Sequence, residues 1–300
     1  MVELRKRNLL ESGARLIHHL DNVLDEDLGY PDPPSWGYAF TFLASEYFNG
    51  ENSLSLSKKA LKHLFLQEKN SPNYSWEFVV YALQVAKKKT SFEIPKDLDC
   101  YREKGTRMFN WFLLRVLNKK LCNEFGYIER IKLWIASKLY QESSGLIIDE
   151  FKTRSLQYHA FCLFLLAELL QFDIKNDLLR KWFIKGVYFS LENILFDGTA
   201  IFIGRGQEQI FGYGALLYSL EFCHKRVEKL DELVLKRVSS KVLSFQRNDG
   251  SFPLVLRNRE PEIEFASFSK NNPPGWYGYN TLYDYQPFLA YCLLKAGNLK

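Results

Sequence analysis

The chain has 300 residues, of which 47% are hydrophobic and 25% are charged. This composition is ordinary for a folded globular domain, and it excludes disordered and collagen-like classes. The net charge is +5, but the basic residues are scattered, which favours solvated helix faces over a nucleic-acid-binding stripe. The five cysteines show no CxxC spacing, so we expect no zinc site and no disulfide framework. The sequence also has no P-loop or dinucleotide-binding pattern, and we expect no cofactor.

The N-terminal segment is basic and then amphipathic. It has neither the continuous apolar region nor the small-residue cleavage pattern of a signal peptide. No run of about 18 uncharged apolar residues occurs along the chain, so we expect no membrane span and no membrane partner. The chain reads as a cytoplasmic protein.

Apolar residues recur at the helical spacing i, i+3, i+4 and i+7 in long stretches, with almost no period-two alternation. The interruptions come every 40 to 50 residues per helix pair, as in stacked helical hairpins. We therefore predict one all-α domain over residues 1–300, folded as an incomplete toroid of five to six α/α hairpins. The predicted helices are 3–20, 36–48, 55–68, 75–89, 100–119, 129–141, 155–171, 176–194, 207–224, 229–246 and 284–296.

Alternate helices differ in character. The stretches 155–171 and 207–224 are apolar nearly all round, whereas 176–194 and 229–246 carry charges on one side. An inner ring and an outer ring of helices would produce this contrast.

Three long connections are rich in Gly, Pro, Asp and aromatic residues. Loops of this length in a compact domain are usually functional or disordered, and the aromatic content argues against disorder. Aromatic residues make up 16% of the whole chain, more than a core normally uses. We expect these loops to wall a cleft at one end of the ring, and they are 25–38, 195–206 and 246–280.

Two inner helices carry polar residues that apolar helices seldom contain. Asn110 lies in the middle of FNWFLLRV, and a buried amide must find hydrogen-bond partners or face a polar cavity. Tyr158 and His159 lie in the first turn after Ser155, the predicted N-cap. The helix dipole there favours neutral imidazole, which could accept a proton. The structural alternatives are an Asn satisfied by neighbouring backbone and a His satisfied in the core.

The segment DGTAIFIGRGQEQIFGYG (197–214) contains a tight turn that leads into a helix. Arg205 stands at this helix start, where free backbone N–H groups would help it to bind a carboxylate. Gln209 and Tyr213 are one turn apart on one face of the helix. Alternatively, Arg205 pairs with a loop carboxylate such as Asp197.

The segment PPGWYGYNTLYDYQPFLAY (273–291) crowds aromatic side chains in front of the last inner helix. Flat aromatic faces bind the apolar faces of sugar rings and also pack in cores. The crowded residues are Trp276, Tyr277, Tyr279, Asn280, Tyr283 and Tyr285.

Taken together, FNWFLLRV, SLQYHAFCLFLL, FDGTAIFIGRGQEQIFGYGAL and GYNTLYDYQPF resemble the (α/α)-toroid portions of heparinase II/III-like and alginate-lyase-like polysaccharide lyases. A related group of uncharacterised bacterial toroid proteins has the same DG-x-A-x-x-x-GR turn and Asn-Trp helix in the same order. The likeness covers patches from about residue 100 to residue 295. It implies an anionic oligosaccharide or polysaccharide as substrate.

Lyases of this kind cleave uronic-acid polymers by β-elimination. A polar group neutralises the uronate carboxylate, a base removes the C5 proton, and an acid protonates the departing glycosidic oxygen. By position, the resemblance implies Asn110 as neutraliser with Arg205 and Gln209, Tyr158 or His159 as base, Tyr213 or Tyr283 as acid, and Trp36, Trp276, Tyr279 and Asn280 as sugar contacts.

Secreted lyases of this type usually pair the toroid with a β-sandwich, which this sequence does not contain. The cleft could be complete alone and act on intracellular oligosaccharides, a partner subunit or second copy could complete it, or catalysis could have been lost. A glycan-binding or scaffold protein is thus one alternative.

Another alternative is a glycoside hydrolase, which needs two carboxylates. The candidates are Asp32, Asp197, Asp249 and Asp284. The turn QRNDGSF also resembles repeats of terpene cyclases, whose acidic motifs are missing here.

Overall fold

The structure of the chain is a computed structural model that describes residues 2–48, 50, 53–71, 74–90, 92–98, 105–151, 154–204, 206–257 and 281–299. The described part is helical, and its only extended pairings are isolated β-bridges. Four residues predicted to contact substrate lie outside the described residues, namely Arg205, Trp276, Tyr279 and Asn280.

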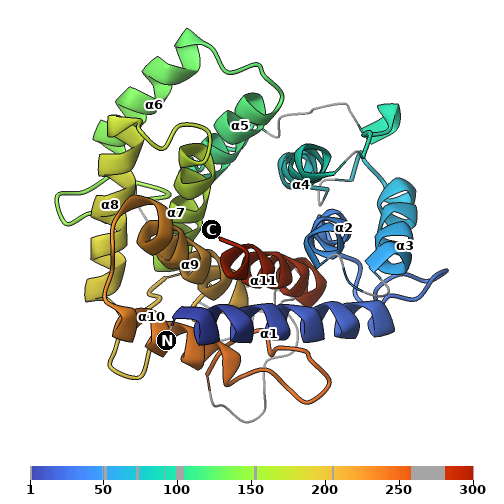
Figure 1. Cartoon of the computed structure of the whole chain (residues 1–300). Helices are drawn as coiled ribbons and strands as arrows, with labels where there is room; N and C mark the ends of the chain where they lie inside the picture. Colours follow the sequence, from blue (N-terminus) through green and yellow to red (C-terminus); the bar gives the residue numbers. More distant parts are fainter. Residues whose placement is uncertain are drawn as a thin grey trace.

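Six of the described helices form a closed inner ring (Figure 1). Each contacts the next in the order α2, α4, α5, α7, α9, α11, and α11 returns to α2. Aromatic side chains fill the centre, where the ring of Phe288 lies 4.7 Å from that of Phe211 and 5.2 Å from that of Phe164. The ring is therefore a packed core. Its helices are α2 (Gly37–Phe48), α4 (Trp76–Lys89), α5 (Phe109–Leu121), α7 (Leu156–Leu170), α9 (Ile210–Phe222) and α11 (Leu282–Gly297).

Outer helices cover the ring (Figure 1). The predicted contrast between the layers is confirmed, because α7 and α9 are buried nearly all round whereas an outer helix such as α10 buries one face. An inner helix touches two inner neighbours and the outer layer, so it has little surface left for charges. The outer helices are α1 (Val2–Val23), α3 (Ser53–Leu66), α6 (Tyr127–Leu139), α8 (Asp177–Glu192) and α10 (Glu232–Leu243), and a π-helical turn, η2 (Cys223–Val227), follows α9.

The alternation of layers is interrupted between α4 and α5, which are both inner helices. The described part of this connection holds only a short 3-10 turn, η1 (Lys96–Leu98), in the place of an outer helix. The predicted helix 100–119 was therefore too long at its start, since α5 begins at Phe109. Gly105 has a positive φ of 64°, which does not continue an α-helix.

One turn recurs where outer helices end. Gln141 donates hydrogen bonds to the carbonyls of Gly145 and of Trp182 in α8. Gln246 donates in the same way to the carbonyls of Gly250 and of Ser12 in α1, at 2.9 Å each. The turn after α10 therefore joins the last outer helix, α10, to the first, α1. The outer layer thus closes through the same kind of contact that joins the turn after α6 to α8.

The same turn requires glycine for two reasons. Gly250 has a φ of 90°, and a Cβ atom there would collide with the backbone carbonyl of Arg15 in α1. Gly198, after α8, likewise lies against the carbonyl of Arg237 in α10. Glycine thus lets each turn approach the backbone of the next outer helix.

Candidate active site at the N-terminal end of the inner ring

A pocket of about 180 Å³ lies where the inner helices begin, and we call it the axial pocket. Every inner helix contributes a residue from its first turns or from the position just before it. The predicted working end of the ring therefore does contain a cavity. Its lining residues are Trp36, Ser75, Phe78, Thr106, Met108, Asn110, Trp111, Asp149, Tyr158, Phe161, Phe211 and Tyr285.

Aromatic rings make up the floor and much of the wall of the axial pocket. Trp36 stacks on Phe78 with centroids 4.7 Å apart and an interplanar angle of 12°. Trp111 meets Phe78 edge-on at 5.5 Å, and Tyr285 lies 5.2 Å from Phe211. Flat apolar surfaces of this kind suit the apolar face of a sugar ring.

Asn110 brings an amide into this aromatic surround. The carboxylate of Asp149 accepts the Asn110 backbone N–H at 2.9 Å, and the Asp149 carbonyl accepts the Phe109 N–H at 3.0 Å, so Asp149 fixes the start of α5. The side chain of Asn110 is 4% exposed, and its Oδ1 has no hydrogen-bond partner among the described residues. A buried polar atom without a partner is costly. A polar ligand in the axial pocket would supply the missing bond.

The N-terminus of each helix carries the positive end of its dipole. At the starts of α5 and α2 the carboxylates of Asp149 and Asp284 already accept backbone N–H groups, which leaves the starts of α4 and α7. Ser75 is the N-cap of α4 and lines the pocket, and its side chain makes no capping bond. Ser155 is the N-cap of α7, as predicted, although its side chain also makes no capping bond. Backbone N–H groups at such starts favour an anionic ligand.

Tyr158 and His159 are adjacent in sequence but face different surroundings. Tyr158 lines the axial pocket. His159 Nδ1 accepts the Ile147 N–H at 2.9 Å, and its Nε2 lies 3.1 Å from the carbonyl of Gly186 in α8. Burial lowers the pKa of His159 to about 4. The imidazole is therefore neutral, as expected, but burial rather than the helix dipole is the main cause, and both nitrogens serve structural contacts.

Three further predicted residues lie outside the lining of the axial pocket. Tyr213 is fully buried and its hydroxyl accepts the Ala200 N–H at 3.2 Å, while burial raises its pKa. Gln209 is buried and accepts a bond from Gln157 at 3.2 Å. Tyr283 stacks on Tyr30 at 4.6 Å.

The four carboxylates considered for hydrolysis do not line the axial pocket. Asp284 is buried and accepts the N–H groups of Trp36 and Gly37 at 2.8 and 2.7 Å, so it fixes the start of α2. Asp197 and Asp249 each accept bonds from a residue two positions later in an exposed or half-exposed turn. Asp32 is half-buried, and burial raises its pKa.

Asp149 and Tyr285 line the axial pocket but were not among the predicted site residues. Tyr285 stood in the predicted aromatic cluster, but only the rotation of α11 distinguishes it from Tyr283. Asp149 follows the apolar run LII, but it bonds to the start of α5 and not to that of α7, which comes next in the sequence, so no local capping pattern marks it.

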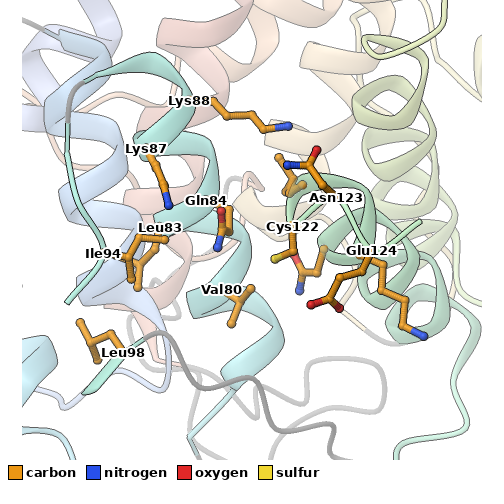
Figure 2. Close-up of a pocket in the computed structure, with 13 residues that line it drawn as sticks. Val80, Leu83, Gln84, Lys87, Lys88, Ile94, Leu98, Cys122, Asn123 and Glu124 are labelled. Atoms are coloured by element: carbon orange, nitrogen blue, oxygen red, sulfur yellow. The ribbon is translucent and has the colours of Figure 1, made fainter. Parts of the chain in front are cut away.

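A larger hollow of about 540 Å³ lies elsewhere, between α4 and α5, where no outer helix covers the described part of the ring. In Figure 2, Gln84 and Val80 on α4 face Cys122 and Glu124 across the gap, and Lys88 reaches towards Asn123. None of the predicted site residues lines it. Its size follows from the missing cover, and the axial pocket is the better candidate site.

No group of three or more His, Cys, Asp or Glu side chains within the described residues is arranged to hold a metal ion. None of the helices in this part of the chain combines the length and the apolar character that crossing a bilayer requires.

No protein-family model matches the chain, and no curated protein matches its sequence. Solved structures do match its fold. A polysaccharide lyase matches with a TM-score of 0.64 at 12% identity over 97% of both chains. A glycosyl hydrolase of family 88 from Bacteroides vulgatus matches with a TM-score of 0.63 at 11% identity, over 96% of this chain and 99% of the other.

A type II terpene cyclase from Scytonema matches with a TM-score of 0.60 at 12% identity, over 98% of this chain and all of the other. At these identities the likeness shows the fold. The predicted (α/α) toroid is confirmed, together with its similarity to the toroid of a polysaccharide lyase.

Proposed function

We propose that this protein is a carbohydrate-active enzyme that binds an anionic sugar in the axial pocket and cleaves a uronic-acid-containing glycan by β-elimination. The observation that carries the proposal is the meeting of Asn110 of α5, Tyr158 of α7 and Trp36, directly before α2, in one pocket. The similarity to a polysaccharide lyase supports it.

The lining residues can be given roles in this reaction. The amide of Asn110 can turn to present its NH₂ group to the uronate carboxylate, which makes the C5 proton more acidic. Tyr158, as phenolate, takes that proton. The C4–O bond then breaks as the C4–C5 double bond forms, and the departing oxygen takes a proton from Tyr285. Tyr285 thereby replaces Tyr213 and Tyr283 as the proposed acid, and Tyr158 is preferred to His159.

The size of the pocket bears on the ligand. Pockets for drug-sized ligands usually measure about 300–1,000 Å³, and the axial pocket measures about 180 Å³. One sugar ring fits such a space better than a long isoprenoid chain does. The unpartnered Asn110 Oδ1 is an acceptor, so it also favours a ligand with a hydroxyl group that can donate to it. Arg205, Gln209, Trp276, Tyr279 and Asn280 remain proposed as further substrate contacts.

A glycoside hydrolase is the second candidate, because Asp149 lines the axial pocket. Hydrolysis canonically requires a second carboxylate facing the first across the substrate. Because Asp149 is already bonded to the start of α5, it is a positioning group in the elimination mechanism. In the hydrolytic mechanism it would instead be a catalytic group.

The test incubates the protein with a panel of uronate polymers and oligosaccharides and follows two signals. Elimination produces an unsaturated uronyl end that absorbs in the ultraviolet, whereas hydrolysis produces reducing ends without that absorbance. We expect absorbance, and we expect Asn110→Ala to lower kcat about 10²–10³-fold, as loss of one charge-stabilising donor does. Reducing ends without absorbance would establish hydrolysis. Glycan binding without either signal would make the protein a binding module.

A further inference from the structure

The outer helix α6 presents an apolar face to solvent. Amphipathic helices normally turn their apolar stripe towards the core. In α6 only Glu129, Leu133 and Ala136 are buried. The solvent-exposed large apolar side chains, which we call the α6 face, are Tyr127 (76% exposed), Ile128 (63%), Ile131 (40%), Trp134 (56%), Ile135 (44%) and Leu139 (55%).

The residues of the α6 face form one continuous stripe. Their spacing of three and four positions places them on one side of the helix. Figure 1 shows α6 at the outer edge of the ring, next to α8. Phe151, 59% exposed, stacks at 5.0 Å on Tyr140, the residue directly after α6, and so extends the apolar surface. Contiguous patches of this kind mark interaction sites.

The exposed charges of α6 itself have one sign. Arg130 and Lys132 are exposed on its two borders, and Lys138 is exposed within it. The only acidic residue of the helix, Glu129, is turned inwards, where it accepts bonds from Lys119 and from the Gly126 N–H at 3.1 Å each. The outward surface of α6 is thus both apolar and basic.

We propose that the α6 face binds the surface of a lipid bilayer that contains anionic headgroups. An apolar stripe with Trp and Tyr, bordered by basic residues, matches the helices that lie in the interface plane of a membrane. The basic borders would attract anionic lipids. Face-to-face pairing of two copies would bring like charges together, which is why the lipid surface is the better occupant.

The experiment uses the full chain and two kinds of vesicle, one of phosphatidylcholine and one of phosphatidylcholine mixed with an equal amount of phosphatidylglycerol. We expect co-sedimentation with the anionic vesicles, a blue shift of tryptophan fluorescence, and weakening by salt. Ile131→Ser/Ile135→Ser should lower the affinity at least about tenfold. The matched control is Leu54→Ser/Leu66→Ser on outer helix α3, where the two leucines are 66% and 69% exposed, and it should bind as the wild type does.

Three results would overturn the proposal. The first is the absence of co-sedimentation with anionic vesicles. The second is equal binding of the wild type and the Ile131→Ser/Ile135→Ser variant. The third is a concentration-dependent dimer that this variant abolishes, since a second copy would then occupy the face. Because the replaced side chains are exposed, circular dichroism should show an unchanged fold in both variants.

Discussion

At the scale of single residues, the buried polar side chains of this protein fall into two groups. His159, Tyr213 and Asp284 have partners that hold neighbouring segments in place. Asn110 Oδ1 has no partner among the described residues and lies at a cavity. The first group should therefore affect stability when changed, and Asn110 should affect ligand binding and turnover.

Two tyrosines, Tyr285 and Tyr213, distinguish an effect on turnover from an effect on stability. Tyr285 lines the axial pocket, whereas the hydroxyl of Tyr213 holds the Ala200 N–H. Tyr285→Phe should lower kcat at least about 10²-fold, as loss of a general acid does. Tyr213→Phe should leave kcat within a few-fold and lower the free energy of unfolding by about 1 kcal/mol. Kinetics on a uronate substrate and urea unfolding measure both, and the reverse pattern would assign the acid to Tyr213.

His159 predicts how stability depends on pH. Burial lowers its pKa from 6.5 to about 4 in the folded protein, so the unfolded state binds more protons between these values. The contribution of His159 is fully present above pH 6.5 and is lost as the pH falls towards 4. His159→Gln should flatten the dependence of the urea midpoint on pH between 7 and 5. His18→Gln, at an exposed site of α1, should not, and an unchanged slope in His159→Gln would refute the assignment.

At the scale of elements, a buried ion pair ties two inner helices together. Lys295 of α11 donates to Glu168 of α7 at 2.5 Å, and the side chains are 6% and 4% exposed. Tyr81 and Tyr218 also donate to Glu168, at 2.7 and 2.6 Å. The carboxylate is thus surrounded by donors from three other inner helices, α4, α9 and α11.

Breaking this pair from one side should be costly. Lys295→Met leaves the Glu168 charge buried without its counter-charge and should lower the free energy of unfolding by about 3–5 kcal/mol. Glu168→Gln/Lys295→Met removes both charges and should recover most of that loss. Chemical denaturation of the two variants provides the comparison. If the double variant were as unstable as the single one, packing and not charge would explain the effect.

The recurring turn predicts a steric effect at ring closure. Gly250→Ala introduces a Cβ atom against the Arg15 carbonyl at a φ of 90°. Gly105 is a control with a φ of 64° and no atom within 4 Å of an added Cβ, so Gly105→Ala reports backbone strain alone, about 1 kcal/mol. Gly250→Ala should cost about 1–3 kcal/mol more, as measured by thermal unfolding. Equal costs would mean that the turn does not hold α1 and α10 together.

At the scale of the whole molecule, helical periodicity was enough to predict the helical hairpins and the two layers. It could not assign every side chain to a surface. Tyr158 and His159 differ by one position, yet one faces the axial pocket and the other faces α8. The rotation of each helix decides this, and it depends on contacts made across the ring.

The same limit applies to the outer layer. The helix at 129–141 was predicted from its amphipathic pattern. The pattern does not say which side of the helix faces the core. In α6 the apolar side faces solvent. Periodicity also did not predict that the described residues between α4 and α5 contain no outer helix, because 100–119 reads as one helix. Only tertiary contacts show that α5 belongs to the inner ring.

The central claim is that the N-terminal end of the inner ring binds the uronate substrate. A crystal structure of the Tyr158→Phe variant with a uronate oligosaccharide tests it most directly. We predict one sugar ring in the axial pocket against Trp36 and Trp111, with its carboxylate at Asn110. Electron density for the sugar in the lysine-rich hollow between α4 and α5, with the axial pocket occupied by water alone, would contradict the account.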